Sequence, residues 1–227
     1  MTQITKNLEK LRSRIARAAT AAGRNENEVS LLPVSKRHPV DSIENAHAAG
    51  LSSMAENYLQ EALEKIPACS ADINWHFIGR IQSNKTRAIA ENFDWVQTVS
   101  SLKVARRLSE QRPTTLKALN VCLQINTDDQ QGHAGITPEE APALCAAIEE
   151  LPGLSLRGLM CIPQPADSTE AQRTPFRRLR ELYEQLKRAG YQLDTLSMGM
   201  STDLEAAIAE GSTMVRIGTA LFGPRPS

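Results

Sequence analysis

The sequence has few aromatic residues and no net charge. Aromatic side chains make up 4% of the 227 residues, so any core must be mainly aliphatic. Lys and Arg together number 26, and so do Asp and Glu. This balance argues against a general binder of nucleic acids or membrane surfaces, because both need an excess of basic residues. With 41% hydrophobic and 23% charged residues, the composition is that of a globular protein and excludes a wholly disordered chain.

Long hydrophobic runs and paired cysteines are also lacking. No apolar stretch approaches the roughly 20 residues that span a bilayer. The first residues contain no apolar run of the kind found in secretory signals, so secretion is not expected. The first 24 residues are basic, as in a transit peptide, but their apolar positions share one helical face, which favours an amphipathic helix. The four cysteines form no C-x-x-C pair and are expected to be reduced thiols in a cytoplasmic protein (Cys69, Cys122, Cys145 and Cys161).

Short apolar runs alternate with longer helical patterns along the whole chain. Their length and uniform apolarity are typical of buried parallel strands. The predicted strands are 30–35, 51–54, 75–79, 94–99, 119–126, 155–161, 194–198 and 213–217. The predicted helices between and after them are 41–49, 57–66, 82–92, 101–111, 138–150, 169–189 and 203–209. Thr202 and Glu205 have the spacing of a capping box at the start of the last of these helices.

Eight strands recurring about every 26 residues, with helices between them, indicate β-α units and a parallel sheet. Eight such units predict a closed (β/α)8 barrel, and the whole chain, 1–227, is expected to form this single domain. The rival is an open doubly wound sheet, which usually carries G-x-G-x-x-G after its first strand. Here that turn reads V-S-K-R-H-P, which favours the barrel.

In such a barrel the functional face consists of the loops that follow the strands. Lys36 follows the first strand, where partial desolvation would lower the pKa of its amine and suit Schiff-base chemistry; an ordinary solvated lysine is the simpler interpretation. Gly199 and Gly218 follow the last two strands, near the hydroxyls of Ser201 and Thr219. These loops either make plain turns or bind a phosphate group.

Two further polar residues interrupt apolar strands. Arg216 lies on the opposite face of the last strand from Val215 and Ile217. Because the strand is expected to be buried, its guanidinium needs a partner, either an internal acid or the ring nitrogen of a cofactor. His76 is expected to be a hydrogen-bonded core residue. The histidines show no metal-ligand spacing with any Cys or carboxylate, so no metal site is predicted.

Six long motifs together resemble the pyridoxal phosphate homeostasis protein family (YggS/PROSC type). The resemblance extends from the first helix to Gly223. It is carried by P-V-S-K-R-H-P (33–39), A-E-N-Y-L-Q-E (55–61), W-H-F-I-G-R-I-Q-S-N-K (75–85), R-G-L-M-C-I-P (157–163), L-S-M-G-M-S-T-D-L-E-A-A-I (196–208) and G-S-T-M-V-R-I-G-T-A-L-F-G (211–223).

The resemblance implies the barrel of the alanine racemase N-terminal domain, holding pyridoxal 5′-phosphate as an internal aldimine on Lys36. It implies that Arg216 lies at the pyridine nitrogen. The other cofactor-binding positions that it implies are Asn57, His76, Met200, Ser201, Ile217, Gly218 and Thr219. Its further implications are a protein that maintains the vitamin B6 pool, has no catalytic residues and no robust activity, and passes cofactor to apo-enzymes. The cysteine pattern indicates the cytoplasm, and the expected lack of a second domain favours a monomer.

Two other functions stay open. A carboxylate beside the ring nitrogen keeps that nitrogen protonated, whereas an arginine cannot accept its proton. The cofactor would therefore be a weak electron sink and poorly suited to racemisation. A racemase also needs a second acid/base group; alanine racemases use a tyrosine from another domain, which this chain is expected to lack. Tyr58, expected on the second helix of the β-α series, is a remote substitute. A Schiff-base aldolase explains Lys36 but not Arg216.

Overall fold

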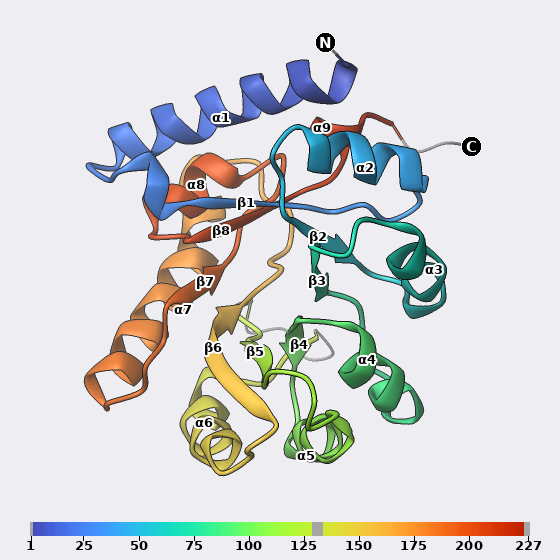
Figure 1. Ribbon diagram of the computed structural model, residues 1–227. Helices are drawn as coiled ribbons and strands as arrows, with labels where there is room; N and C mark the ends of the chain where they lie inside the picture. The colour runs from blue at the N-terminus through green and yellow to red at the C-terminus, as the bar shows by residue number, and fades with distance from the viewer. Residues whose placement is uncertain (1, 129–133, 225–227) are drawn as a thin grey trace.

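The computed structural model describes residues 2–128 and 134–224 and contains one eight-stranded parallel sheet (Figure 1). Its strands are β1 (Ser30–Pro33), β2 (Ser53–Glu56), β3 (Asn74–Phe77), β4 (Trp95–Val99), β5 (Leu119–Gln124), β6 (Leu154–Met160), β7 (Thr195–Ser197) and β8 (Met214–Ile217). The helices are α1 (Gln3–Ala21), α2 (Val40–Ala48), α3 (Leu59–Lys65), α4 (Thr86–Asn92), α5 (Leu102–Gln111), α6 (Ala141–Glu149), α7 (Thr169–Arg188), α8 (Leu204–Ala209) and α9 (Thr219–Phe222). Short 3-10 turns are η1 (Glu26–Glu28), η2 (Ile66–Ala68), η3 (Ser83–Lys85) and η4 (Pro138–Glu140).

The strand order confirms the predicted barrel. Neighbours run β1-β8-β7-β6-β5-β4-β3-β2, all parallel, so successive strands are adjacent as right-handed β-α units require. The barrel closes between β1 and β2 by a single bridge from Val34 to Ala55, where the amide of Ser35 also donates to Ala55 O at 3.0 Å. Helices surround the strands, and α1 lies across the barrel beside α8 and α9 (Figure 1). In the described ranges no helix combines the length and apolarity of a membrane span.

One strand boundary and one helix cap were predicted wrongly. The second strand spans Ser53–Glu56 and not 51–54: Leu51 is buried, as an apolar strand residue would be, but it precedes the strand. The capping box does not form: Asp203 is the N-cap of α8 and makes no side-chain cap bond. Glu205 instead pairs with Arg14 of α1 at 2.7 Å, so a tertiary ion pair replaces the local bond.

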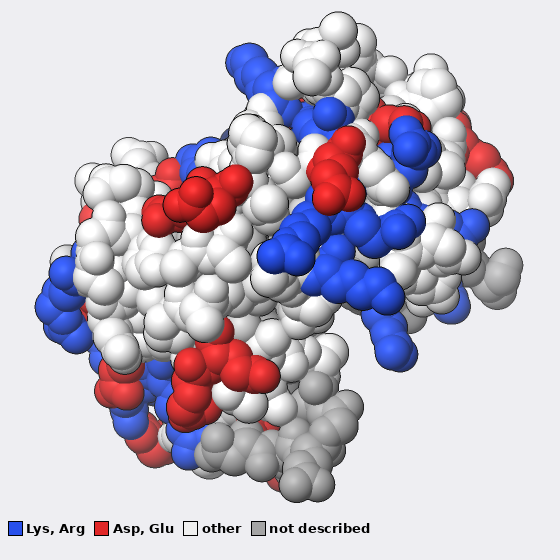
Figure 2. Space-filling view, turned by 90° about the horizontal axis from the view of Figure 1, so that it is seen from below, with Lys and Arg blue, Asp and Glu red and all other residues white. Residues whose placement is uncertain are grey.

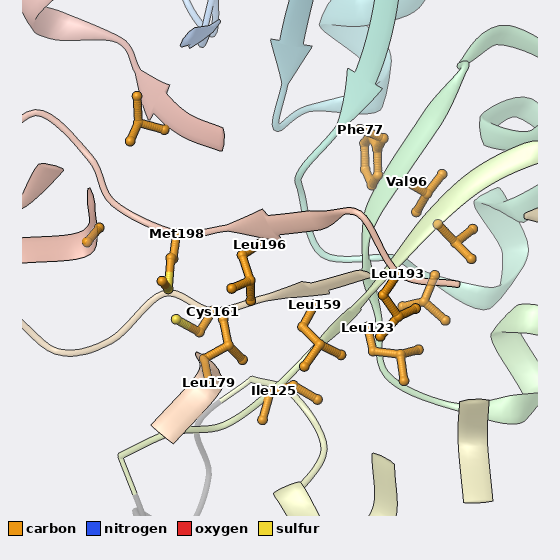
Figure 3. Packing of buried hydrophobic residues seen from close by; sticks show 14 of the residues in the cluster. Phe77, Val96, Leu123, Ile125, Leu159, Cys161, Leu179, Leu193, Leu196 and Met198 are labelled. Atoms are coloured by element: carbon orange, nitrogen blue, oxygen red, sulfur yellow. The ribbon is translucent and has the colours of Figure 1, made fainter. Parts of the chain in front are cut away.

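The main core lies between the strands and the surrounding helices and is largely aliphatic, as the composition predicts. Figure 3 shows side chains from successive strands, including Val96, Leu123, Leu159 and Leu196, packed in one layer with Leu179 of α7. A separate small cluster lies on the alternate positions of the first strands (Leu32, Val34, Ala55 and Ile78). Burying this apolar surface is the main favourable term in folding.

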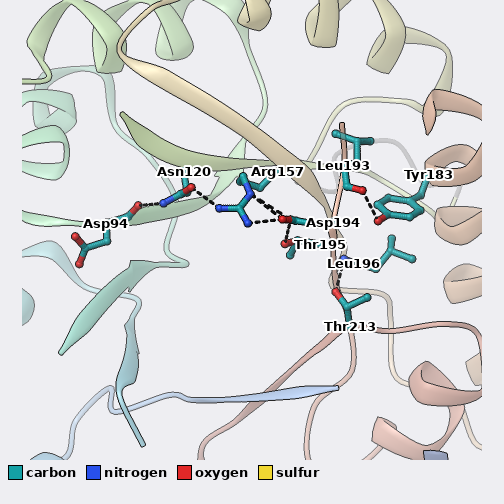
Figure 4. A network of polar contacts seen from close by, with 9 residues as sticks. All are labelled: Asp94, Asn120, Arg157, Tyr183, Leu193, Asp194, Thr195, Leu196 and Thr213. Carbon is teal, nitrogen blue, oxygen red and sulfur yellow. Dashed lines mark hydrogen bonds and ion pairs between the residues drawn. The ribbon is translucent and has the colours of Figure 1, made fainter. Parts of the chain in front are cut away.

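A polar network ties together the amino-terminal ends of β4 to β7 (Figure 4). Arg157 donates to Asn120 Oδ1 at 2.7 Å and to the Asp194 carboxylate at 3.1 Å. Asn120 donates to the carbonyl of Asp94 at 3.1 Å, and the Arg157 guanidinium lies 4.8 Å from the centre of the Trp95 ring. This end is opposite the loops that carry function in barrels, so the network contributes to stability.

Replacing Arg157 with Met should lower the free energy of unfolding by about 1–2 kcal/mol, because Asn120 and Asp194 lose a charged donor. Urea unfolding monitored by circular dichroism measures the change. Arg188→Met, at an exposed position in the last turn of α7, is the matched control and should have little effect. Equal losses in the two variants would contradict the assignment.

Candidate functional site

The carboxyl ends of β1 and β8 bring Lys36 and Gly218 to the same edge of the barrel. Leu32 pairs with Arg216 in the register of these strands, and the amide of Val34 donates to Ile217 O at 2.9 Å. Lys36 lies three residues beyond the end of β1 and is half-buried. Its position after the first strand agrees with the prediction.

Arg216 is 3% exposed and is held by neutral acceptors. Its Nη1 donates to Ser197 O at 2.6 Å and to Ser197 Oγ at 2.7 Å, while Nη2 donates to Cys161 O at 2.8 Å. No carboxylate in residues 2–128 and 134–224 forms an ion pair with it. Burial lowers the pKa of the guanidinium. A direct ion pair with an internal acid is therefore wrong for the described residues. The hydrogen bonds of Arg216 go to neutral acceptors, and the carboxylate of Asp203 interacts with its charge without contact.

A chain of hydrogen bonds connects Arg216 to His76 across the barrel. Ser197 Oγ donates to Gln97 Oε1 at 2.6 Å, and Gln97 Nε2 donates to His76 Nδ1 at 3.0 Å. The His76 ring stacks on Trp95 with centroids 5.1 Å apart. His76 is thus a hydrogen-bonded core residue, as its place in the sequence predicts. Ser197 and Gln97 were missed, although both are polar residues in strands predicted to be buried.

The buried His76 gives the fold a defined pH dependence. Burial lowers the pKa of His76 from 6.5 to about 3. Below pH 6.5 the unfolded chain binds a proton that the folded protein excludes, so stability is full above that pH and falls as the pH approaches 3. The loss attributable to His76 should be about 1.4 kcal/mol per pH unit.

Urea unfolding of the wild type and of His76→Gln between pH 7 and pH 5 should isolate this term, because other titrating groups cancel in the difference. We expect a weaker pH dependence in the variant. Parallel pH profiles for the two proteins would show that His76 is not buried in its neutral form.

The loop after β7 reaches the same edge beside β8, where the amide of Arg216 donates to Gly199 O at 2.9 Å. Gly199 has φ 96°, the left-handed region that favours glycine. Ser201 and Met200 are half-buried. The amide of Met200 is already bonded to Asp203 Oδ1 at 2.5 Å, so Met200 can line a ligand but its N–H is taken.

The β8 loop places its three predicted residues differently. Gly218 has room: a Cβ built on it would come no nearer than 3.4 Å to another atom. Thr219 is exposed at the first position of α9. Ile217 is fully buried in the cluster that faces the helices, together with Val215, so its main chain, and not its side chain, lies nearest the site.

Asn57 lies on the other side of Lys36, directly after β2. Its Oδ1 is buried and has no hydrogen-bond partner among the described residues. A Cβ on Gly79 would lie 1.9 Å from Asn57 O, so only glycine lets these two loops approach. A pocket of about 630 Å³ opens beside Asn57; Arg80, Ser101, Gln124 and Ile162 also line it.

Tyr58 does not lie on a helix. It is the N-cap of α3 and is 50% exposed, and the guanidinium of Arg37 lies 5.9 Å from the centre of its ring. Tyr58 thus follows β2 at the barrel mouth, and its ring lies near Arg37, the residue after Lys36. The other two tyrosines are occupied: Tyr183 Oη donates to Leu193 O at 2.9 Å, and Tyr191 Oη to Pro142 O at 3.4 Å.

The neutral total charge does not reflect an even distribution of charge. Figure 2 shows Lys and Arg side chains gathered on one face of the molecule. The segments η3, α4 and α5 lie next to one another, and their exposed basic residues are Lys85, Arg87, Lys103 and Arg106. A local positive surface thus exists, although the net charge alone gives no sign of it.

The cysteines are free thiols, in agreement with the prediction. Burial raises the pKa of Cys161 to about 12, so this thiol is a poor nucleophile although its carbonyl accepts from Arg216. Across the described ranges, no three His, Cys, Asp or Glu side chains converge as metal ligands.

The fold and site define a class of proteins. A family model described as the alanine racemase N-terminal domain matches residues 6–226, so the chain belongs to the proteins built on this barrel. The structure of an alanine racemase from Clostridium difficile superposes with a TM-score of 0.77 at 19% identity, covering 99% of this chain and 57% of that chain. At that identity the likeness concerns the fold alone.

Within this class the chain belongs to the pyridoxal phosphate homeostasis protein family. The family member from Pseudomonas aeruginosa is 56% identical over 226 residues, covering 99% of this chain and 97% of that protein. The member from Haemophilus influenzae is 50% identical, covering 98% and 96%. The structure of PipY from Synechococcus elongatus with pyridoxal phosphate bound has a TM-score of 0.84 at 35% identity, covering 97% of this chain and all of that one.

Proposed function

We propose that this protein binds pyridoxal 5′-phosphate at the carboxyl end of its barrel, as an aldimine on Lys36, and contributes to the homeostasis of that cofactor. The proposal depends chiefly on two basic side chains at the carboxyl ends of the adjacent strands β1 and β8. A half-buried lysine follows β1, and the buried Arg216 of β8 is held by neutral acceptors. Family membership and the cofactor-bound PipY structure support it.

The surrounding residues suit the three chemical groups of the cofactor. Lys36 supplies an amine for the aldehyde, and Arg216 supplies a donor for the ring nitrogen. The phosphate is assigned to the loops after β7 and β8, where barrels commonly bind phosphate. The residues assigned to it are Ser201, Gly218 and Thr219, with Met200 and the main chain of Ile217 alongside.

Asn57 and His76 have different parts in this proposal. The unpartnered Oδ1 of Asn57 is available to accept from the cofactor, and the side chain lies beside the mouth. His76 lies within β3 and acts through Gln97 and Ser197, which orient Arg216. Burial keeps His76 neutral, and because the amide nitrogen of Gln97 can only donate to Nδ1, we assign the ring proton to Nε2.

Weak catalysis follows from the same arginine. A guanidinium stays charged and donates, so the ring nitrogen of the bound cofactor would remain unprotonated and the ring a poor electron sink. We therefore assign the protein a binding role without robust activity. The alternative is an amino-acid racemase. Its second acid/base group would be Tyr58, which is exposed and lies directly before α3.

Two measurements test this function. Titrating the protein with pyridoxal phosphate should produce the absorbance of a protein-bound aldimine at a one-to-one ratio. The loaded protein is then incubated with L-alanine in heavy water, and we expect negligible deuterium at the α-carbon. Rapid α-deuteration would establish a racemase-like reaction and contradict the non-catalytic role; its loss in Tyr58→Phe would then identify the second acid/base group.

We further propose a cytoplasmic monomer that passes its cofactor to apo-enzymes. The aldimine permits such transfer because another amine can displace Lys36 from the aldehyde. The rate of cofactor release should rise when an apo-enzyme is added in place of an inert protein, and analytical ultracentrifugation should give a single species near 24.9 kDa. Release that is independent of the acceptor would mean transfer through free solution.

A further inference from the structure

A buried ion pair lies next to the segment that carries Lys36. Glu56, the last residue of β2, is fully buried, and Lys65, the last residue of α3, is 7% exposed. Lys65 Nζ lies 2.8 Å from Glu56 Oε1. Burial raises the pKa of Glu56, and Lys65 opposes the rise. Removing two charges from water is costly, so this pair needs a compensating role.

The pair binds the residue that precedes Lys36. Lys65 Nζ donates to Ser35 O at 2.9 Å, and Ser35 Oγ donates to Glu56 Oε1 at 2.7 Å. Ser35 is itself fully buried, and its amide is bonded to β2 through Ala55 O at 3.0 Å. Every polar group of Ser35 is thus fixed by β2 or by the ion pair.

The same ammonium also controls the residue that follows Lys36. Glu61 Oε1 accepts from Lys65 Nζ at 2.5 Å and from the amide of Arg37. Arg37 has φ 63° and is the one non-glycine residue in the described ranges with a left-handed backbone. This conformation is unfavourable for a side chain with a Cβ and persists where surrounding contacts impose it.

We propose that Glu56 and Lys65 are positioning residues that hold the main chain on both sides of Lys36, so that its amine is presented to the cofactor in one orientation. This inference rests on the function proposed above and concerns residues outside the set assigned to cofactor binding. Their location supports it, since the pair lies at the carboxyl end of the barrel, whereas the stabilising network of Arg157 lies at the other end.

The test removes the pair without leaving one charge buried alone. The double variant Glu56→Gln/Lys65→Met takes away both charges, and Ser35→Ala removes only the hydroxyl contact. The rate of pyridoxal phosphate release into an excess of trapping apo-enzyme should rise about tenfold or more in the double variant, because small misplacements of a reacting group have large kinetic effects. Ser35→Ala should change the rate in the same direction by less.

Two further readouts separate positioning from general stability. The pH dependence of the loaded protein's absorbance should shift in the double variant, and amide hydrogen exchange at Arg37 should accelerate in the cofactor-free protein. The matched control is Glu210→Gln: Glu210 is 1% exposed, pairs with Arg173 at 2.7 Å, and lies before β8 at the far end of the barrel. It should lower stability and leave release, pH profile and Arg37 exchange unchanged.

Unchanged release and pH profile in the folded double variant would overturn the inference. If that variant does not fold, wild-type release and exchange rates in Ser35→Ala overturn it. A wild-type protein that binds no cofactor through Lys36 would contradict the proposed function instead, and exchange at Arg37 would still decide whether the pair fixes the main chain.

Discussion

Replacing Lys36 by alanine is expected to abolish the aldimine absorbance and to weaken binding of pyridoxal phosphate by at least about a hundredfold, or about 2.7 kcal/mol. The reason is that the covalent link through the Lys36 amine is lost, while the phosphate loops and Arg216 remain to give residual, non-covalent binding. Spectroscopic titration and equilibrium dialysis measure the two quantities.

The matched control for this variant is Lys103→Ala. Lys103 is exposed on α5, away from β1 and β8, and its loss should change neither the spectrum nor the affinity. An unchanged spectrum and affinity in Lys36→Ala would show that the assignment of the aldimine is wrong.

Arg216→Met is expected to have the second large effect, on both stability and binding. The carbonyls of Ser197 and Cys161 would lose a charged donor in a buried setting, at a cost of about 1–3 kcal/mol each, partly offset because the buried charge is also removed. Urea unfolding should show a net loss. Affinity for pyridoxal phosphate should fall about tenfold, as expected when one charge-assisted hydrogen bond is removed.

Arg157→Met serves as the control because Arg157 is another barrel arginine, at the opposite end. It should reduce stability and leave cofactor affinity unchanged. If both variants lost stability and neither lost affinity, Arg216 would be a structural residue only, and its assignment to the ring nitrogen would fail.

The sequence predicts the barrel well because buried parallel strands are uniformly apolar and recur with the helices between them. It also predicts the position of Lys36, Gly199 and Gly218, since a residue that follows a strand in such a barrel must lie at its mouth. These inferences need only local pattern and topology, and the eight strands all appear, with shifts of one to two residues at most of their ends.

The interior contacts could not be predicted in the same way. Gln97 and Ser197 are 100 residues apart, and alternation shows which face a side chain takes but not which side chain it meets across the barrel. Glu56 falls between the predicted strand 51–54 and the predicted helix 57–66, but it is the buried last residue of β2. Its carboxylate can be buried because the ammonium of Lys65, from the next helix, balances the charge. The capping box failed for a similar reason, since Arg14 competes for Glu205.

The central claim is that Lys36 carries the cofactor, and one measurement tests it directly. The wild-type protein is loaded with pyridoxal phosphate, reduced with borohydride, digested, and sequenced by tandem mass spectrometry. We expect one dominant phosphopyridoxyl adduct, on Lys36 within the segment P-V-S-K-R-H-P. An adduct chiefly on another lysine, or none at all, would contradict it.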